Sequence, residues 1–166
     1  LAYRVKSSSV SEDYFTAVIF NGLFGGFPHS KLFLNVREKE SLAYYASSSL
    51  DTFRSYLSVQ TGIEGKNRDH VLHLITEQLE SLQRGEISDL ELLQTKANLK
   101  NQFLMTQDSP QGQMELYFRQ VFLNECITEE MWLKKLEAVT VEDVSQYAKD
   151  VRLESIYFLE GVTYEN

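Results

Sequence analysis

The sequence predicts an α+β domain, an α/β sandwich in which helices cover one face of a small, mostly antiparallel sheet. Two predicted strands, 42–50, which is rich in Tyr, Ala and Ser, and 56–63, which alternates, are joined by a connection short enough for an antiparallel hairpin. The segment after them changes to helical periodicity, and four later segments each begin with residues that cap helices. Strands and helices are therefore partly segregated along the chain, which is typical of α+β folds.

The region before the hairpin predicts one strand, at 1–5, and two helices. Residues 9–12 form a capping box for a helix over 12–24, which two consecutive glycines end. A second helix over 28–39 begins at a proline, a residue that suits the first helical turn.

Five further helices are expected after the hairpin, followed by a final strand at 155–159. The first, over 68–83, carries its apolar residues on one stripe, and the second runs from about 89 to 105. In that second helix Lys96 falls inside the apolar arc, so we expect it to be packed, with its ammonium reaching solvent or meeting a carboxylate. The other three helices begin after the capping residues Ser109, Thr128 and Thr140.

The composition fits one globular domain spanning residues 1–166. Hydrophobic residues make up 43% and charged residues 24% of the chain, which excludes a disordered protein. Sixteen basic and 24 acidic residues give a net charge of −8, which argues against binding to nucleic acid or to an anionic membrane. The apolar runs are shorter than the roughly 18 residues that a membrane-spanning helix needs, so none is expected.

Cysteine use indicates a reducing compartment. Cys126 is the only cysteine, so neither an internal disulfide nor a cysteine-based zinc site can form. We therefore expect a cytoplasmic protein. The chain begins with Leu1 rather than Met, and we expect it to be part of a longer polypeptide.

The histidines decide whether a metal site is expected. His70, His73 and Glu77 share one face of the predicted helix over 68–83, and this spacing can hold zinc. That face lies opposite the apolar stripe, however, so a solvated polar face is the favoured interpretation. The zinc motifs H-E-x-x-H and H-x-x-E-H are absent. We expect no metal and no cofactor in this chain.

Other catalytic motifs are equally weak. There is no G-x-S-x-G nucleophile elbow, and Cys126 has no activating neighbour in the sequence. The glycine-rich segment 22–26 lacks the lysine of a phosphate-binding loop and does not follow a strand, so a helix terminator is favoured there.

Arg37 and Tyr44 form a more informative pair. Arg37 is expected on a helix and Tyr44 on the strand that follows, seven residues later. Both side chains can donate hydrogen bonds to a peptide carbonyl, and a guanidinium can also hold an oxyanion. Periodicity alone still favours a solvated helix residue and an ordinary sheet aromatic.

Six short motifs, taken together and in order, give a resemblance to a known family. They are Leu23-Phe24-Gly25-Gly26, Ser30-Lys31-Leu32-Phe33, Val36-Arg37-Glu38-Lys39, Leu42-Ala43-Tyr44, Glu91-Leu92-Leu93-Gln94-Thr95-Lys96 and Val139-Thr140-Val141-Glu142-Asp143-Val144. The chain resembles the second-half domain of M16 metallopeptidases, the pitrilysin/insulinase family, and within it the non-catalytic member of bacterial paired proteins. Ser41 departs from the pattern, because many relatives place Gly there.

The resemblance implies a fold and a function. Two sandwich halves of this family close like a clam around a peptide, and zinc sits on the H-x-x-E-H helix of one half. The other half supplies an arginine and a tyrosine that help hold the peptide and steady the tetrahedral intermediate. These positions fall on Arg37 and Tyr44. The chain is then not catalytic alone, but part of a zinc metalloendopeptidase assembly whose partner half carries the zinc.

Two alternatives stay open. The chain could be the second half of a polypeptide whose first half carries the zinc motif, or a purely structural or peptide-binding subunit. If the first interpretation holds, Arg37 and Tyr44 should present their polar ends to one open concave surface. Because adjacent strand residues point to opposite faces, one of Tyr44 and Tyr45 should pack under the helices while the other faces the chamber. The resemblance assigns the chamber role to Tyr44.

Overall fold

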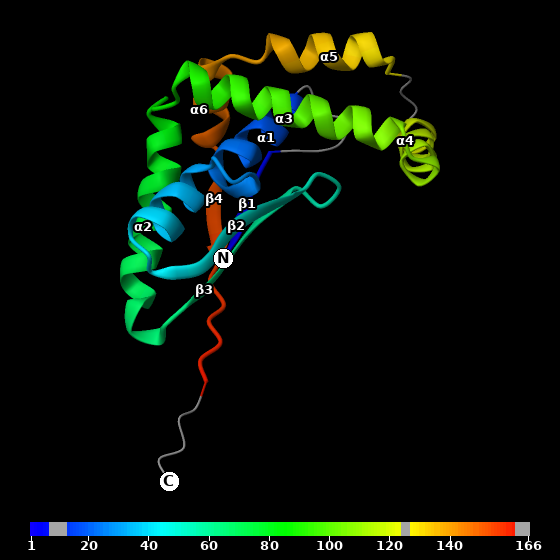
Figure 1. The fold of residues 1–166 in the computed structure, drawn as a ribbon. Coiled ribbons are helices and arrows are strands. Elements are labelled where there is room, and N and C mark those ends of the chain that lie inside the picture. Colours follow the sequence, from blue (N-terminus) through cyan, green and yellow to red (C-terminus); the bar gives the residue numbers. More distant parts are fainter. Residues whose placement is uncertain (7–12, 124–126, 162–166) are drawn as a thin grey trace.

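Four strands form one antiparallel sheet in the order β2-β3-β1-β4 (Figure 1). The structure is a computed structural model that describes residues 1–6, 13–123 and 127–161. The strands are β1 (Ala2–Arg4), β2 (Ala43–Asp51), β3 (Tyr56–Ile63) and β4 (Arg152–Ser155). The helices are α1 (Tyr14–Asn21), α2 (Arg68–Gln83), α3 (Asp89–Gln107), α4 (Pro110–Leu123), α5 (Glu129–Ala138) and α6 (Val141–Ala148). The predicted α+β class is confirmed.

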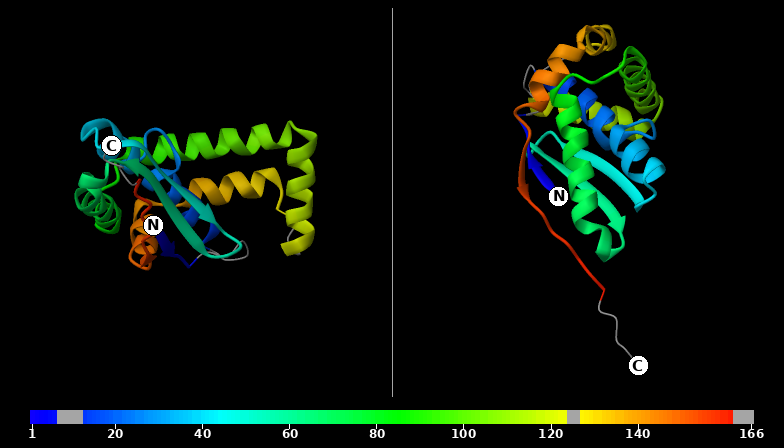
Figure 2. Two further views of the ribbon diagram at one scale, coloured as in Figure 1. Left: turned by 90° about the horizontal axis from the view of Figure 1, so that it is seen from below. Right: turned by 90° about the vertical axis from the view of Figure 1, so that its left-hand side faces the viewer.

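The helices gather over one face of the sheet, and the core lies between the two layers (Figures 1 and 2). Phe20 and Phe24 are fully buried there with their rings stacked 5.6 Å apart, and Tyr3 of β1 meets Phe24 edge-on. Tyr147 of α6 also packs against Phe20, with the two ring centres 5.4 Å apart. These rings join the first helix, the sheet and the last helix into one apolar core.

Local signals predicted several elements well. Helix α2 has the predicted bounds, and all five residues of its apolar stripe are buried. The capping boxes that begin at Ser88 and Thr140 are both formed, and Thr128 caps α5. The capping box expected at 9–12 lies outside the described residues, as does Cys126.

The two helices before the hairpin are wound differently from the prediction. After α1 the chain continues as a π-helix, η1 (Gly22–Gly26), and the second predicted helix starts only at η2 (Leu32–Lys39), also a π-helix. Close packing explains a glycine in η1, because a Cβ atom at Gly25 would lie 2.6 Å from the backbone nitrogen of Ser48 on β2. A short 3₁₀ turn, η3 (Gly65–Asn67), leads into α2.

The predicted position of the last strand is wrong. Strand β4 ends at Ser155, where the prediction began, and pairs Leu153 with Tyr3 and Arg152 with Arg4. The apolar run after Ser155 favoured a later strand, but pairing with β1 decides the position. Arg4 strengthens it by an exposed ion pair to Glu154 across the strands.

Lys96 is packed, as predicted, but it reaches neither of the expected destinations. Its residue is 8% exposed, and its ammonium donates a 2.7 Å hydrogen bond to the carbonyl oxygen of Glu137, near the end of α5. A helix C-terminus carries partial negative charge, so a cation is stabilised there. The predicted apolar arc is only partly right, because Leu90 and Leu93 are exposed.

Helix α4 stands across the far end of α3, away from the sheet (Figures 1 and 2). Four apolar residues of α4, which are Met114, Tyr117, Phe118 and Val121, are between 63% and 70% exposed. None of the helices among the described residues is long and apolar enough to cross a membrane.

Candidate functional site

The corner between η2 and β2 brings Arg37 and Tyr44 together. The Nε atom of Arg37 donates a hydrogen bond of 3.2 Å to the backbone carbonyl of Tyr44, and Nη1 pairs with Glu38 at 2.9 Å. The guanidinium carbon lies 4.5 Å from the centre of the Phe33 ring. Three contacts therefore hold the guanidinium in one orientation at a partly exposed position.

Ser41 makes the turn of this corner with a left-handed backbone conformation. Its φ angle is +53°, in the region where glycine is favoured and other residues are strained. Glycine would adopt this backbone conformation without strain. The Ser41 hydroxyl donates a hydrogen bond to the Glu38 carbonyl, and the contact between Arg37 and Tyr44 is still formed.

A β-bulge at Tyr44 overturns the expectation that one of the two tyrosines is buried. The register pairs Ala43 with Ile63 but Tyr45 with Gly62, so Tyr44 is an extra residue in its strand. Tyr44 is 76% and Tyr45 51% exposed, while Ala43 is buried. The simple alternation of faces fails at such a bulge, and both phenol rings lie on the surface.

The structure joins Arg37 to the main chain of Tyr44 and leaves the phenol of Tyr44 exposed. That the two side chains face a common chamber stays a prediction. So does their role toward a substrate.

The polar face of α2 is exposed, as the helical wheel indicated. His73 Nε2 lies 3.3 Å from a carboxylate oxygen of Glu77, and both side chains are largely solvated. His70 is exposed on the same helix. Within the described ranges, we find no group of three or more histidine, cysteine or acidic residues placed to hold a metal ion.

His29 has a different environment, between the start of η2 and α3. Its Nε2 lies 2.9 Å from the hydroxyl of Thr95, and its ring stacks on Phe27. Burial lowers the pKa of His29, only partly opposed by the charge of Glu91. This histidine is therefore a packed, mostly neutral residue that links two elements.

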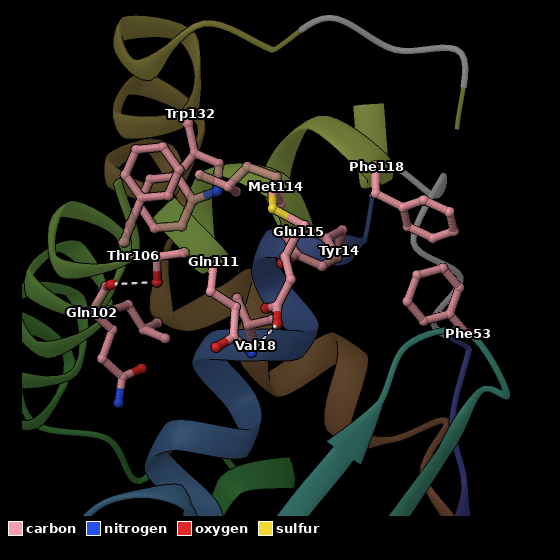
Figure 3. Close-up of a pocket in the computed structure, with 13 residues that line it drawn as sticks. Tyr14, Val18, Phe53, Gln102, Thr106, Gln111, Met114, Glu115, Phe118 and Trp132 are labelled. Atoms are coloured by element: carbon pink, nitrogen blue, oxygen red, sulfur yellow. Dashed lines mark hydrogen bonds between the residues drawn. The ribbon is translucent and has the colours of Figure 1, made fainter. Parts of the chain in front are cut away.

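A second candidate site was missed by the sequence analysis. It is a cavity of about 850 Å³ between α1, α3, α4, α5 and the tip of the β2–β3 hairpin (Figure 3). We call it the α4 cavity. Its lining residues are Tyr14, Val18, Phe53, Leu99, Gln102, Phe103, Thr106, Gln111, Met114, Glu115, Leu116, Phe118 and Trp132. The signal in the sequence was the group of large apolar residues within 114–121, several of which stay exposed in the folded domain.

Comparison with known proteins establishes the family. The model of the Peptidase M16 inactive domain matches residues 1–99. The chain belongs to this family. YmfF of Bacillus subtilis, named a probable inactive metalloprotease, is 42% identical over 161 residues, which are 97% of this chain and 38% of YmfF. The M16 resemblance drawn from the short motifs is therefore confirmed.

Two further proteins place this inactive M16 domain among its relatives. A conserved protein of Enterococcus faecalis V583, known from a crystal structure, has a TM-score of 0.97 and 48% identity, covering 100% of this chain and 39% of that protein. YmxG of Bacillus subtilis, named an uncharacterized zinc protease, is 27% identical over 145 residues, or 84% of this chain and 35% of YmxG. The chain thus spans about two fifths of the length of these relatives.

Proposed function

We propose that this chain is the non-zinc-binding half of an M16-type peptidase clamshell. It binds extended peptide and supplies Arg37 and Tyr44 to a zinc site carried by a partner half. The observation that carries the proposal is the corner itself, where three contacts fix a guanidinium that is bonded to the main chain of Tyr44, a residue whose phenol is exposed. The family membership supports it, since the matched domain is described as inactive.

The chemistry of the corner suits peptide hydrolysis. The negative charge of a tetrahedral intermediate develops on the former carbonyl oxygen, and donors fixed in advance stabilise it most. Arg37 uses Nε and Nη1 for its own positioning, while Nη2 makes no hydrogen bond among the described residues. Nη2 and the Tyr44 hydroxyl are therefore available as donors. Activation of the attacking water is what zinc supplies when bound in the partner half.

Turnover of a fluorogenic peptide by the complete assembly, purified with its zinc-bearing half, tests the proposal. Arg37→Ala should lower kcat about 100-fold and leave KM much less changed, because the lost contact forms mainly in the transition state. Tyr44→Phe should lower kcat about ten-fold. Arg54→Ala is the matched control, since Arg54 is an exposed arginine that pairs with Asp51 at the hairpin tip.

Unchanged turnover in both site variants would contradict the catalytic role and favour a structural or purely peptide-binding subunit. The other alternative is that zinc is carried by the same longer polypeptide, and the name of YmxG as a zinc protease supports it. The name of YmfF, as an inactive metalloprotease, supports a separate partner. Zinc analysis of the longest native polypeptide that contains this chain distinguishes the two. A cytoplasmic location remains a proposal that depends on the single cysteine.

A further inference from the structure

The α4 cavity has the size and lining of a ligand site. Its volume of about 850 Å³ lies within the range of about 300–1,000 Å³ that is usual for ligand pockets. One wall is an aromatic pair, Phe103 and Trp132, whose rings stack 4.1 Å apart and nearly parallel. Phe53 and Phe118 lie on the side of the cavity away from Trp132 in Figure 3. Large apolar groups can therefore bind between aromatic walls.

The polar groups of the cavity are few, and their charge is one-sided. Among the described lining residues Glu115 is the only acidic one, and it accepts a 3.3 Å hydrogen bond from the side-chain amide of Gln111 (Figure 3). Gln102 lines the cavity on the α3 side, and its side-chain amide can pair with peptide groups. None of the lining residues that the structure describes is a lysine or an arginine. A ligand that fits combines large apolar groups with one positive charge.

The cavity lies at the opposite end of β2 from the Arg37 corner. Tyr44 stands near the beginning of the strand, and Phe53 follows two residues after its last residue, Asp51. Nine strand residues at about 3.3 Å each separate the two regions by roughly 30 Å. One extended peptide of about nine residues can therefore reach both places.

We propose that the α4 cavity is a peptide-binding site for segments that join bulky apolar side chains to a lysine or arginine. The apolar side chains lie against Trp132 and Phe118, and the cation pairs with Glu115. This inference defines the substrate class of the peptide-holding role proposed above and rests on it, but it uses a surface separate from Arg37 and Tyr44.

Trp132 gives a local readout of this site, because it is the only tryptophan of the 166-residue chain. Its emission should shift and saturate when the protein is titrated with acetyl-Phe-Leu-Lys-Phe-amide. Acetyl-Phe-Leu-Glu-Phe-amide should bind at least five-fold more weakly, and acetyl-Ser-Ser-Lys-Ser-amide should produce no saturating shift. The first comparison tests the charge, and the second tests the apolar contacts.

Variants separate the two contributions. Glu115→Gln should weaken the lysine peptide about five-fold and bring the two Phe-Leu peptides close together in affinity. Phe118→Ser should weaken the binding of both Phe-Leu peptides. Tyr117→Ser and Glu80→Gln are matched controls, since both residues are exposed but do not line the cavity. Circular dichroism and cooperative unfolding check that each variant is folded.

Three outcomes would overturn the inference. The first is a Trp132 emission that none of the peptides changes, and the second is an unchanged preference for lysine in Glu115→Gln. The third is an emission that depends on protein concentration alone, with a dimer in sedimentation, which would make the cavity an interface between copies. Arg37→Ala should leave these titrations unchanged. The cavity proposal can therefore fail while the catalytic proposal holds, and the reverse.

Discussion

The first half of α3 and helix α4 are neighbours in the chain, but they are held in very different ways. In α3 the side chains of Glu91, Thr95 and Lys96 each contact another element: Lys31, His29 and the Glu137 carbonyl, respectively. In α4 the large apolar side chains are mostly exposed, and its main helical neighbour is α3. An isolated helix of 14 residues is marginal in water, so α4 depends on what contacts it.

This difference separates structural residues from candidate binding residues. Polar side chains that are buried must find partners, and those of α3 do so across the domain, which fixes the helix in place. Exposed apolar side chains add little to the stability of the free protein, but they contribute binding energy when a ligand covers them. We therefore expect substitutions in the first half of α3 to change stability, and substitutions in α4 to change binding.

The largest effect is expected at Lys96. Lys96→Ala removes a packed stem and a charge-assisted hydrogen bond to the Glu137 carbonyl. It should lower the free energy of unfolding by about 3 kcal/mol. Urea unfolding followed by Trp132 fluorescence measures the change. Lys96→Met keeps most of the stem, so its loss should be about half as large; equal losses in both variants would show that packing contributes nothing.

Lys96 also shows how far sequence reasoning reaches in the fold. The 3.6-residue period placed it on a packed face, because helix periodicity is a local property. The period did not show that it meets a backbone carbonyl of α5, since that depends on how the helices are assembled. For the same reason the π-helical winding of η1 and η2 was not predicted, whereas the bounds of α2 were.

The next effect is expected where η1 approaches α3. A Cβ atom at Gly22 would lie 2.7 Å from the Cγ2 methyl of Thr95, so Gly22→Ala forces the two elements apart. Overpacking of this kind costs about 1–3 kcal/mol, and the better helix propensity of Ala offsets part of it, leaving a loss of about 1.5 kcal/mol. Thermal unfolding measures it, and Gly161→Ala, in open surroundings, should change nothing.

A double variant tests whether the methyl contact is the cause. Thr95→Ser keeps the hydroxyl that meets His29 but removes the methyl group. In the background of Gly22→Ala it should recover part of the lost stability, with a coupling of at least about 0.5 kcal/mol. Purely additive losses would place the strain on Phe27, the other close neighbour of that Cβ position.

The candidate site was predicted less completely than the fold. Six motifs in a fixed order identified Arg37 and Tyr44 as candidate site residues, because the order and spacing of motifs can be read from the sequence alone. The bulge at Tyr44 was missed, because strand alternation assumes an unbroken register with β3. The α4 cavity was missed because its walls come from five separate segments, and a one-dimensional pattern cannot show which of them meet.

A smaller, pH-dependent effect is expected at Glu91. Burial raises the pKa of this carboxyl, but hydrogen bonds from Ser88 and Lys31 outweigh burial and hold the pKa below its ordinary value. A carboxyl with a lowered folded pKa stabilises the protein above its unfolded pKa of about 4.3, and this contribution is lost as the pH falls through the folded pKa.

Comparison of the wild type with Glu91→Gln isolates this contribution. Near pH 7 the variant should be about 1 kcal/mol less stable, because it loses the charge of a mostly buried pair with Lys31. The difference should shrink below about pH 4.3, since only the wild type loses an ionised carboxylate there. Urea unfolding at pH 7, 5, 4 and 3 measures it. A difference that stays constant over this range would assign the effect to packing.

The smallest effects are expected in α4, where they test the other side of the comparison. Met114→Ala and Tyr117→Ala remove side chains that are about 70% exposed, so each should change the free energy of unfolding by less than about 0.5 kcal/mol. Met114 lines the α4 cavity and Tyr117 does not. The two variants should therefore unfold alike but differ in the Trp132 titration, where only Met114→Ala weakens the lysine peptide. A loss of stability above about 1 kcal/mol in either would mean that α4 is held as firmly as the first half of α3.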